Sequence, residues 1–533
     1  MYAAVDAPLR RFPFPPIHYD KMQVSEAHFL TIRRGTFSSG ALLWLLASSV
    51  VFGQAPAQQP EFKITAGAVE HQVFQRSADG RANIKISGTA LAKYNNRYVE
   101  ARIVKKDGSQ LSGLDWTPFA ERVKAGKWAG EIKGVPAGGP YKLEARVSGV
   151  PTSLQSVDDV AVGDLWVLAG QSNMEGVGNL VDVQQPIDAV HSFDMADNWG
   201  DAREPIHRLR TAADKVHWAK NDKGELERWT YEKEQAFYAE RKKGAGLSLP
   251  FAVELYRRSG VPIGLIPCAH GGTSMEQWDP AKKAQGGESL YGATIRRINA
   301  VGGQVKGVLW YQGEAEANDQ RVGPFAERFA ALVAAFRADT NQPNLPFYYV
   351  QIGRHVSNAA AGPWNQVQEA QRLAEAKLGN TGMVASIDLT LDDGIHISTP
   401  DLKRLGRRLA MIVAHDQFGE NKDNAAVKRG PRPVSAKFAN GTITLKFAEV
   451  NGSLTSDGRI SGFSIRDDKG AEIPSIYKAR FDGADPTAIL LDVVWNAVPA
   501  GAKLYYGAGR DPYCNVRDTA DMALPVFGPF PIQ

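Results

Sequence analysis

The chain has 533 residues, 43% of them hydrophobic, so it is long enough to bury a substantial core and to form about three or four domains. Its 62 basic and 58 acidic residues leave a formal net charge of +4. Such a balance gives no field of a single sign and argues against binding to nucleic acid or to a membrane surface. The two cysteines, Cys268 and Cys514, are too few to form a disulfide framework for the fold.

The first predicted element is a secretory signal peptide within residues 1–57. Arg33 and Arg34 precede an uncharged apolar run over residues 41–52, and small residues follow in "GQAPAQ". This arrangement is typical of a signal peptide, and the run is too short to persist as a membrane span after cleavage. A buried core helix is the alternative interpretation. The prediction is export to the periplasm or the cell exterior.

Two regions show the period-two alternation of β-strands. Residues 61–158 contain "ANIKISG", "YVEARIV" and "YKLEARV", separated by turn residues. Residues 430–533 repeat the style with "GTITLKF", "AILLDVVW" and "AKLYYG". Both regions are predicted to be β-sandwich modules that flank a different central domain.

Residues 159–425 alternate continuous apolar runs with helical patterns. The five runs are "DLWVLAG", "PIGLIP", "VKGVLWYQ", "PFYYVQIG" and "GMVASID". Strands of this kind, with helices between them, predict an α/β domain with a parallel sheet covered on both faces. A charged, Trp-containing segment at 181–243 is predicted to be an insertion, either a lid or sugar platform over the site or a solvated surface helix.

Polar residues follow four of these five strands. Ligands of open parallel sheets bind at the carboxyl ends of the strands, so these residues are predicted to share one edge of the sheet. In strand order they are Ser172, then Gly271 and Gly272, then Gln312 and Glu314, and finally Asp393 and His396.

These residue types match the needs of acyl transfer, which uses a hydroxyl nucleophile, a base, an acid that orients the base, and donors for the oxyanion. Asp393 and His396 lie three residues apart, just before the predicted helix start at Thr399-Pro400. Ser172 has a simpler alternative role as a helix N-cap. Its surroundings also depart from the G-x-S-x-G elbow, because Met174 stands at the last glycine; if Ser172 is catalytic, the fold is therefore not an α/β-hydrolase.

The motifs "GQSNMEG", "GGTSMEQW", "LWYQGEAEAND" and "DDGIHIS" together resemble the SGNH hydrolases, in particular their sialate O-acetylesterase branch and its acetylxylan-esterase relatives. The resemblance extends over most of the chain after the signal segment. It implies a flavodoxin-like three-layer α/β/α domain, with the two β modules on its flanks.

The resemblance also implies residue roles. Ser172 would be the nucleophile, His396 the general base and Asp393 the residue that orients the histidine. The backbone N–H groups of Ser172 and Gly272 would hold the oxyanion. Gln312 would be the third oxyanion donor, at a position where many SGNH enzymes use an asparagine.

The predicted function is a serine carbohydrate esterase that removes O-acetyl groups from glycans, with O-acetylated sialate and acetylated hemicellulose as competing substrates. The alternatives are a catalytically inactive glycan-binding protein and a lipid or thioester hydrolase of the same superfamily. No cofactor or obligate protein partner is expected. No metal is expected either, because no His/Cys cluster has the spacing of zinc ligands. Candidate substrate-binding residues are Gln171, Glu314, Trp278 and Trp310, with core packing as the alternative for the two tryptophans.

Overall fold

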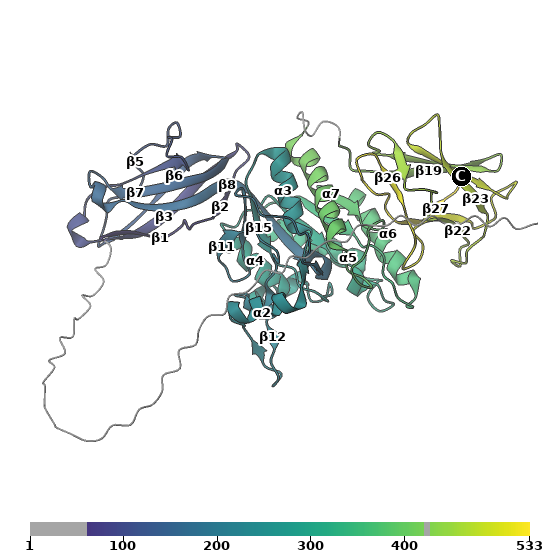
Figure 1. Ribbon diagram of the computed structural model, residues 1–533, viewed down its shortest axis with the longest axis horizontal. Coiled ribbons are helices and arrows are strands. Elements are labelled where there is room, and N and C mark those ends of the chain that lie inside the picture. Colours follow the sequence, from purple (N-terminus) through teal and green to yellow (C-terminus); the bar gives the residue numbers. More distant parts are fainter. Residues whose placement is uncertain (1–60, 420–426) are drawn as a thin grey trace, which may run out of the picture. The chain divides into compact units, whose positions relative to one another are not determined.

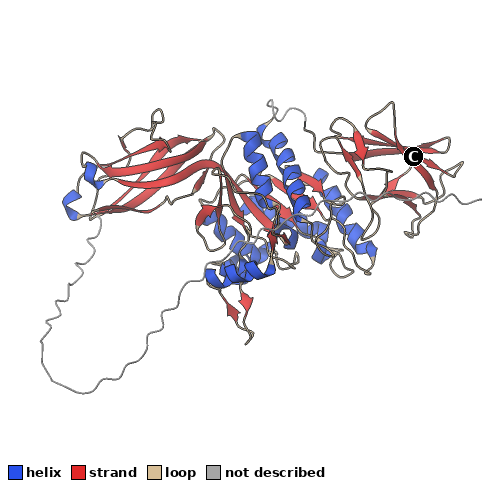
Figure 2. Ribbon diagram, viewed as in Figure 1, coloured by secondary structure: helices blue, strands red, loops and turns tan. Residues whose placement is uncertain are grey.

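The computed structural model describes residues 61–419 and 427–533, and the predicted signal peptide lies outside these ranges. The described residues bury three large hydrophobic cores, one in the central α/β region and one in each flanking β region. The flanking regions consist almost entirely of strands and loops, whereas the long helices belong to the central region (Figures 1 and 2).

The central sheet is mixed, with a parallel core. Its parallel strands follow one another in the order β10, β15, β8, β16, β17, β18, and the short edge strand β11 (Trp199–Asp201) runs antiparallel to β10. All five predicted central strands are present. The parallel strands are β10 (Val190–Phe193), β15 (Ile263–Pro267), β8 (Gln155–Gly170), β16 (Gly307–Tyr311), β17 (Phe347–Gln351) and β18 (Thr381–Ala385).

Strand β10 was not predicted, because it lies within the segment 181–243 that reads as an insertion. All four of its residues are buried. Its sequence, "VHSF", places His191 and Ser192 inside the strand and so lacks the continuous apolar run that marks a buried parallel strand. Part of the predicted insertion is therefore built into the sheet.

Helices connect the parallel strands. Among them α3 packs against α7, and α5 packs against α6. The predicted helix start near residue 399 is present, with Ser398 rather than Thr399 at the cap position. The α-helices are α1 (Ser172–Glu175), α2 (Tyr231–Arg241), α3 (Ser248–Ser259), α4 (Leu290–Ala300), α5 (Phe325–Asp339), α6 (Ala361–Lys377) and α7 (Thr399–Phe418).

The N-terminal region forms the predicted strands. Strands β1, β3 and β6 make a separate three-stranded antiparallel sheet, while β2, β4, β5 and β7 connect through β8 to the central sheet. The strands are β1 (Phe62–Ala66), β2 (Val73–Gln75), β3 (Arg81–Ala90), β4 (Val99–Lys105), β5 (Thr117–Pro118), β6 (Lys127–Pro136) and β7 (Gly138–Val147).

Strand β8 runs across the predicted domain boundary at residue 158. Its first half pairs with β7, and its second half pairs with β15 and β16. One continuous 16-residue strand therefore belongs to both the N-terminal region and the central sheet. Partly buried and exposed residues alternate at the start of β8, whereas every residue of its second half is buried. The sequence pattern therefore predicted two separate elements.

The C-terminal region is antiparallel and encloses its own core. One sheet has the order β19, β20, β24, β23, another has the order β22, β25, β27, and β21 pairs with β26. The strands are β19 (Arg432–Ala439), β20 (Thr442–Ala448), β21 (Leu454–Ser456), β22 (Phe463–Arg466), β23 (Ile476–Phe481), β24 (Ala488–Val493), β25 (Lys503–Tyr506), β26 (Val516–Asp518) and β27 (Phe527–Pro531).

Short elements complete the described chain. The two-stranded pairs are β9 (Gly178–Asn179) with β14 (Lys243–Ala245) and β12 (Ala219–Lys220) with β13 (Leu226–Glu227). The 3-10 helices are η1 (Ala92–Tyr94), η2 (Pro151–Ser153), η3 (Leu209–Thr211), η4 (Lys215–His217), η5 (Pro280–Glu288) and η6 (Glu314–Glu316). Helix α2 buries only Glu234 and Tyr238. Within the described ranges, no helix combines the length and apolarity needed to cross a membrane.

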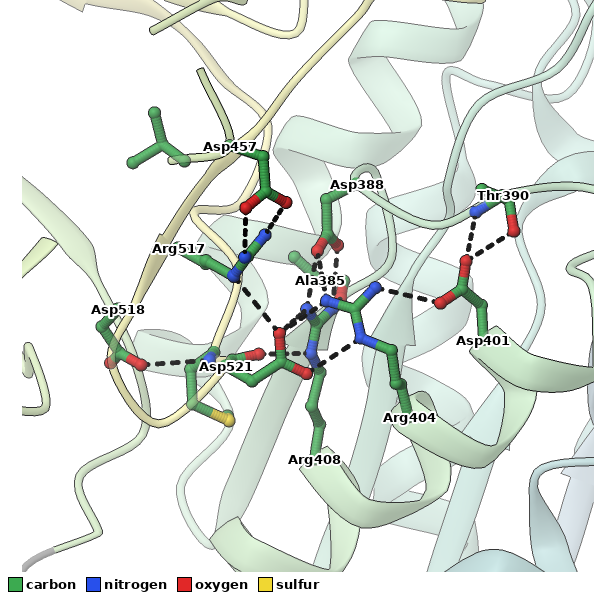
Figure 3. A network of polar contacts seen from close by, with 12 residues as sticks. Ala385, Asp388, Thr390, Asp401, Arg404, Arg408, Asp457, Arg517, Asp518 and Asp521 are labelled. Atoms are coloured by element: carbon green, nitrogen blue, oxygen red, sulfur yellow. Dashed lines mark hydrogen bonds and ion pairs between the residues drawn. The ribbon is translucent and has the colours of Figure 1, made fainter. Parts of the chain in front are cut away.

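A network of charged side chains joins the C-terminal region to α7 and to the loop after β18 (Figure 3). The fully buried Arg408 donates to both carboxylate oxygens of Asp388 at 2.8 and 2.6 Å, and Arg404 donates to Asp521.

The same network reaches the loop that carries Asp393 and His396. Arg404 also donates to Asp401, which accepts two hydrogen bonds from Thr390 at 2.6 Å. Thr390 begins the loop that carries Asp393 and His396, so this network fixes the base of that loop.

Candidate active site

Ser172 lies where the central strand β8 ends. The strand stops at Gly170, Gln171 occupies the N-cap position without a side-chain capping bond, and Ser172 is the first residue of α1. The capping role considered for Ser172 therefore does not apply. Among the hydrogen bonds of the described residues, none involves the Ser172 hydroxyl, and the residue is partly exposed. A serine with a free, accessible hydroxyl at a strand end is suited to act as a nucleophile.

His396 and Asp393 form a close pair on the loop after β18. The His396 Nδ1 atom lies 2.8 Å from Asp393 Oδ2 and 3.0 Å from Oδ1. The backbone N–H groups of Ile395 and His396 also donate to Oδ1, and Lys243 Nζ lies 3.0 Å from Oδ2. Burial opposes ionisation, but these hydrogen bonds outweigh it and hold the pKa of Asp393 well below its usual range.

The neighbouring Asp392 points elsewhere. Its carboxylate accepts from the backbone N–H of Asn179 at 2.9 Å, and its own N–H donates to the His396 carbonyl at 2.8 Å. An isolated antiparallel bridge between Leu391 and Ile397 closes the loop. The loop therefore presents Asp393, and not Asp392, to the imidazole.

Asn173 ties the serine to the histidine loop. Its Oδ1 accepts from the N–H of Ile397 at 3.1 Å, and its Nδ2 donates to the Ile395 carbonyl at 3.4 Å. The residue after Ser172 thus bonds to the residues on both sides of His396. Ser172 and His396 share no direct hydrogen bond here, and catalytic bonds of this kind often tighten only when substrate binds.

The glycine pair after β15 lies against the start of α1. The Gly271 N–H donates to Glu175 Oε2 at 2.7 Å, and a Cβ atom at Gly271 would lie 3.4 Å from the Ser172 Cβ. Gly272 is exposed, has a φ of +71° and would give a Cβ atom only open space. Among the described hydrogen bonds, neither the Ser172 N–H nor the Gly272 N–H has an acceptor. Two backbone donors are therefore free beside the nucleophile candidate.

Gln312 is completely buried beside this loop. Its Nε2 donates to the Thr273 carbonyl at 3.3 Å and to Glu316 Oε1 at 3.4 Å, while its Oε1 has no partner. Both amide hydrogens are thus engaged within the protein, in long hydrogen bonds. The arrangement differs from that of a free third oxyanion donor.

Trp278 and Trp310 have no exposed surface, and their rings pack edge to face with centroids 5.2 Å apart. They pack in the core in this structure, so the prediction that they bind substrate is not supported. Gln171 is also buried and accepts from the N–H of Ala315 at 3.3 Å. Glu314 accepts from Asn173 at 2.9 Å, its Oε2 is unpartnered, and burial raises its pKa.

A hollow of about 470 Å³ adjoins the glycine pair. Its lining is mainly polar, which suits a ligand rich in hydroxyl groups. The polar or glycine residues that line it are His270, Gly271, Gly272, Thr273, Gln277, Lys282, Gln285, Glu288 and Ser289. A larger hollow of about 780 Å³, lined by α6 and by β22 and β25, contains none of the predicted site residues.

Sequence reasoning missed three residues that shape this site. Asn173 and Glu175 stand within "GQSNMEG", and their closeness to Ser172 in the sequence is the signal that could have identified them as site residues. Lys243 lies at the end of the predicted insertion, where no pattern distinguishes it from the other lysines. Its contact with Asp393 depends on the pairing of β14 with β9.

Glu175 supports a prediction about pH. Burial raises its pKa to about 7, although the Gly271 N–H works in the opposite direction. Because this value exceeds the ordinary 4.5, ionisation opposes folding, and the stability of the wild type should fall as pH rises from about 4.5 to 7 and level off above. Glu175→Gln keeps an acceptor oxygen and should remove this dependence.

The same residue should affect catalysis through Gly271. Glu175→Ala removes the acceptor of the Gly271 N–H, which helps to place the adjacent Gly272 N–H as an oxyanion donor. Because the placement of this donor counts mainly in the transition state, the substitution should lower kcat about tenfold with little change in KM. Glu175→Gln should stay near the wild-type kcat. Urea unfolding measured below pH 4.5, between pH 4.5 and about 7, and above pH 7 tests the predicted pH dependence of stability. Ester kinetics test the predicted change in kcat. If the free energy of unfolding falls equally with pH in wild type and in Glu175→Gln, the prediction about stability is contradicted. If Glu175→Ala leaves kcat unchanged, the prediction about catalysis is contradicted.

Comparison with known proteins shows what the central region is similar to. Residues 162–415 match the family described as "Carbohydrate esterase, sialic acid-specific acetylesterase". Human sialate O-acetylesterase is 24% identical over 72% of this chain and 80% of its own length. A probable carbohydrate esterase of Arabidopsis thaliana is 27% identical over 46% of this chain and 88% of its own.

A solved structure supports the fold. The crystal structure of a carbohydrate acetylesterase from Xanthomonas citri superposes with a TM-score of 0.59 at 24% identity, covering 87% of this chain and 99% of that one. The matched residues 162–415 include Ser172, the glycine pair and the Asp393–His396 loop. This region of the chain is therefore similar to the sialic acid-specific acetylesterase family of carbohydrate esterases.

Proposed function

We propose that the protein is a serine esterase that removes O-acetyl groups from glycans through an acetyl-enzyme intermediate. The observation that carries the proposal is the contact of the Asp393 carboxylate with His396 Nδ1, on a loop that Asn173 ties to the Ser172 helix. With Nδ1 donating to Asp393, the Nε2 atom of a neutral imidazole is left as the proton acceptor.

In the first step, His396 Nε2 takes the proton of Ser172 Oγ as this oxygen attacks the acetyl carbonyl carbon. The carbonyl oxygen becomes an oxyanion, held by the backbone N–H groups of Ser172 and Gly272. The bond to the sugar oxygen then breaks, and the sugar hydroxyl leaves with the proton from His396. In the second step, His396 takes a proton from a water molecule as the water oxygen attacks the acetyl carbonyl carbon. His396 then returns the proton to Ser172 Oγ as the bond from this oxygen to the acetyl carbon breaks, which releases acetate and restores Ser172.

Gln312 is proposed as the third oxyanion donor only after its side-chain amide turns. Its hydrogen bonds to Thr273 and Glu316 are long, at 3.3 and 3.4 Å, and such bonds are weak. Its Oε1 has no partner, so the present orientation leaves a buried acceptor unsatisfied. Both features favour an amide that reorients when an oxyanion forms nearby.

The substrate is proposed to be a glycan with O-acetyl groups. The polar hollow beside Gly272 supports a sugar rather than a long acyl chain, which would need a wide apolar trough. O-acetylated sialic acid and acetylated xylo-oligosaccharides remain the two competing substrates. A non-catalytic glycan-binding role has no use for an acid that orients a base.

The deciding experiment measures acetate release from O-acetylated sialic acid, acetylated xylo-oligosaccharides and a simple aryl acetate. Release from a sugar, at a kcat/KM well above that for the aryl acetate, is the expected result, and the better sugar identifies the substrate branch. If no acetate is released from any of the three while the protein binds acetylated sugars, the esterase proposal fails and the glycan-binding role replaces it.

We also propose the finer organisation of the chain. The central region, residues 159–425, would have the three-layer arrangement of SGNH hydrolases, and residues 61–158 and 430–533 would act as β-sandwich modules on its flanks. The paired helices α3–α7 and α5–α6 and the separate cores of the two β regions support this organisation. The arginine pair and apolar run within residues 1–57 support export.

A further inference from the structure

Three side chains with metal-binding atoms meet at the far end of β8 from Ser172. His71, Asp159 and His191 each place one nitrogen or oxygen atom within 4.8 Å of the others. His71 Nδ1 lies 2.8 Å from Asp159 Oδ2, yet the pair lacks hydrogen-bond geometry. Two ligands of one metal ion approach each other closely in this manner without a shared proton.

The sheet brings these residues together from distant parts of the sequence. His71 precedes β2, which pairs in parallel with β8 from Val73 and Ala161 onward. Asp159 lies in β8 at an irregularity of the β7–β8 pairing and has a φ of +55°. A bulge of this kind redirects a side chain, and here it lies beside His71. His191 comes from β10, which is joined to β8 through β15.

His191 is the observation that points to a ligand. Its side chain is 1% exposed, and neither ring nitrogen has a hydrogen-bond partner among the described residues. Its ring centroid lies 5.1 Å from that of His71, so the ring is directed at the cluster. A buried imidazole with no partner is costly and calls for an explanation, and a bound metal ion supplies one.

We propose that His71, Asp159 and His191 form a binding site for a divalent transition metal, with Zn²⁺ as the best fit. Two imidazoles and a carboxylate are ligands that zinc prefers. Ligand atoms of a tetrahedral zinc ion lie about 3.3 Å from one another, a value within the range of the observed separations.

Asp201 is the nearest candidate for the fourth ligand. Its Oδ1 lies 3.9 Å from His71 Nδ1 and 4.0 Å from His191 Nδ1. The same carboxylate accepts from Arg203 at 2.9 Å, which would orient it toward the ion. The side chain is 40% exposed, so a water molecule could complete the coordination instead.

The site would have a structural role that does not depend on the proposed esterase activity. Residues of a strand rise about 3.3 Å each, so Asp159 lies more than about 30 Å along β8 from Ser172. The metal would pin the segment before β2 and the irregular part of β8 to β10, the strand next to the edge strand β11. It would thus lock the N-terminal strands to the central sheet.

The test uses protein without a histidine tag, stripped with a chelator and titrated with Zn²⁺ and with Co²⁺. Wild type should bind one equivalent of zinc, and Co²⁺ should give the visible bands of a tetrahedral site. Asp159→Asn and His191→Gln should each lower the zinc affinity at least about tenfold, since losing even an outer-shell partner costs this much. Zinc should raise the melting temperature of wild type and not of Asp159→Asn.

The adjacent Asp158 provides the matched control, because its exposed carboxylate pairs with Lys142 and not with the cluster. Asp158→Asn should bind zinc as wild type does. If wild type binds no zinc, or if Asp159→Asn and Asp158→Asn bind it equally well, the metal site is ruled out. Circular dichroism confirms that each variant folds. Acetate release, measured with and without chelator, should be unaffected at moderate temperature and tests the esterase proposal separately.

Discussion

Replacement of Ser172 by alanine is expected to lower kcat for acetate release by about 10⁴- to 10⁶-fold, the range seen when a serine hydrolase loses its nucleophile. In the proposed mechanism the Ser172 hydroxyl forms the acetyl-enzyme, and an alanine side chain has no atom that could replace it. Binding of the acetylated sugar should persist, because the backbone donors of Ser172 and Gly272 remain. Single-turnover kinetics and calorimetric binding measure the two effects.

Ser259→Ala is a suitable control for this variant. Ser259 ends α3, and its hydroxyl donates to the Leu255 carbonyl within the same helix. Its removal should leave kcat within about twofold of wild type, as for most substitutions away from a site. If Ser172→Ala keeps more than a few per cent of wild-type kcat, Ser172 is not the nucleophile.

The sequence was sufficient to predict features that depend on local pattern. The five continuous apolar runs of the central region are all buried strands, and α7 begins within one residue of the predicted position. The Asp-x-x-His spacing also predicted the contact between Asp393 and His396, because a short turn suffices to bring the two side chains together.

Features that depend on pairing between distant segments were missed. Strand β10 carries His191 in the middle of a buried strand, so its sequence lacks the usual apolar run. The cluster of His71, Asp159 and His191 has no spacing signature, because three separate segments supply its members. The two tryptophans were ambiguous for a related reason: a Trp at a strand end can pack inward or face the site, and Trp278 and Trp310 pack inward.

The contact between Asp393 and His396 leads to the second large effect. Asp393→Asn should lower kcat by about 10⁴-fold, as the equivalent change does in a serine protease, with little loss of structure. An asparagine amide can donate to Nδ1, which favours the tautomer with the proton on Nε2, and that nitrogen then cannot accept the proton of Ser172. Asp392→Asn is the matched control and should stay within about tenfold of wild type, because Asp392 contacts the Asn179 N–H and not the imidazole.

The lowered pKa of Asp393 sets how these variants should respond to pH. With its pKa held well below the ordinary 3.8, Asp393 stays ionised across the usual assay range, so it should add no step to the pH profile of wild-type kcat/KM. Its contribution to stability is fully present above about pH 4 and is lost only as pH falls through the lowered pKa. A wild-type kcat in Asp393→Asn would show that Asp393 does not orient His396.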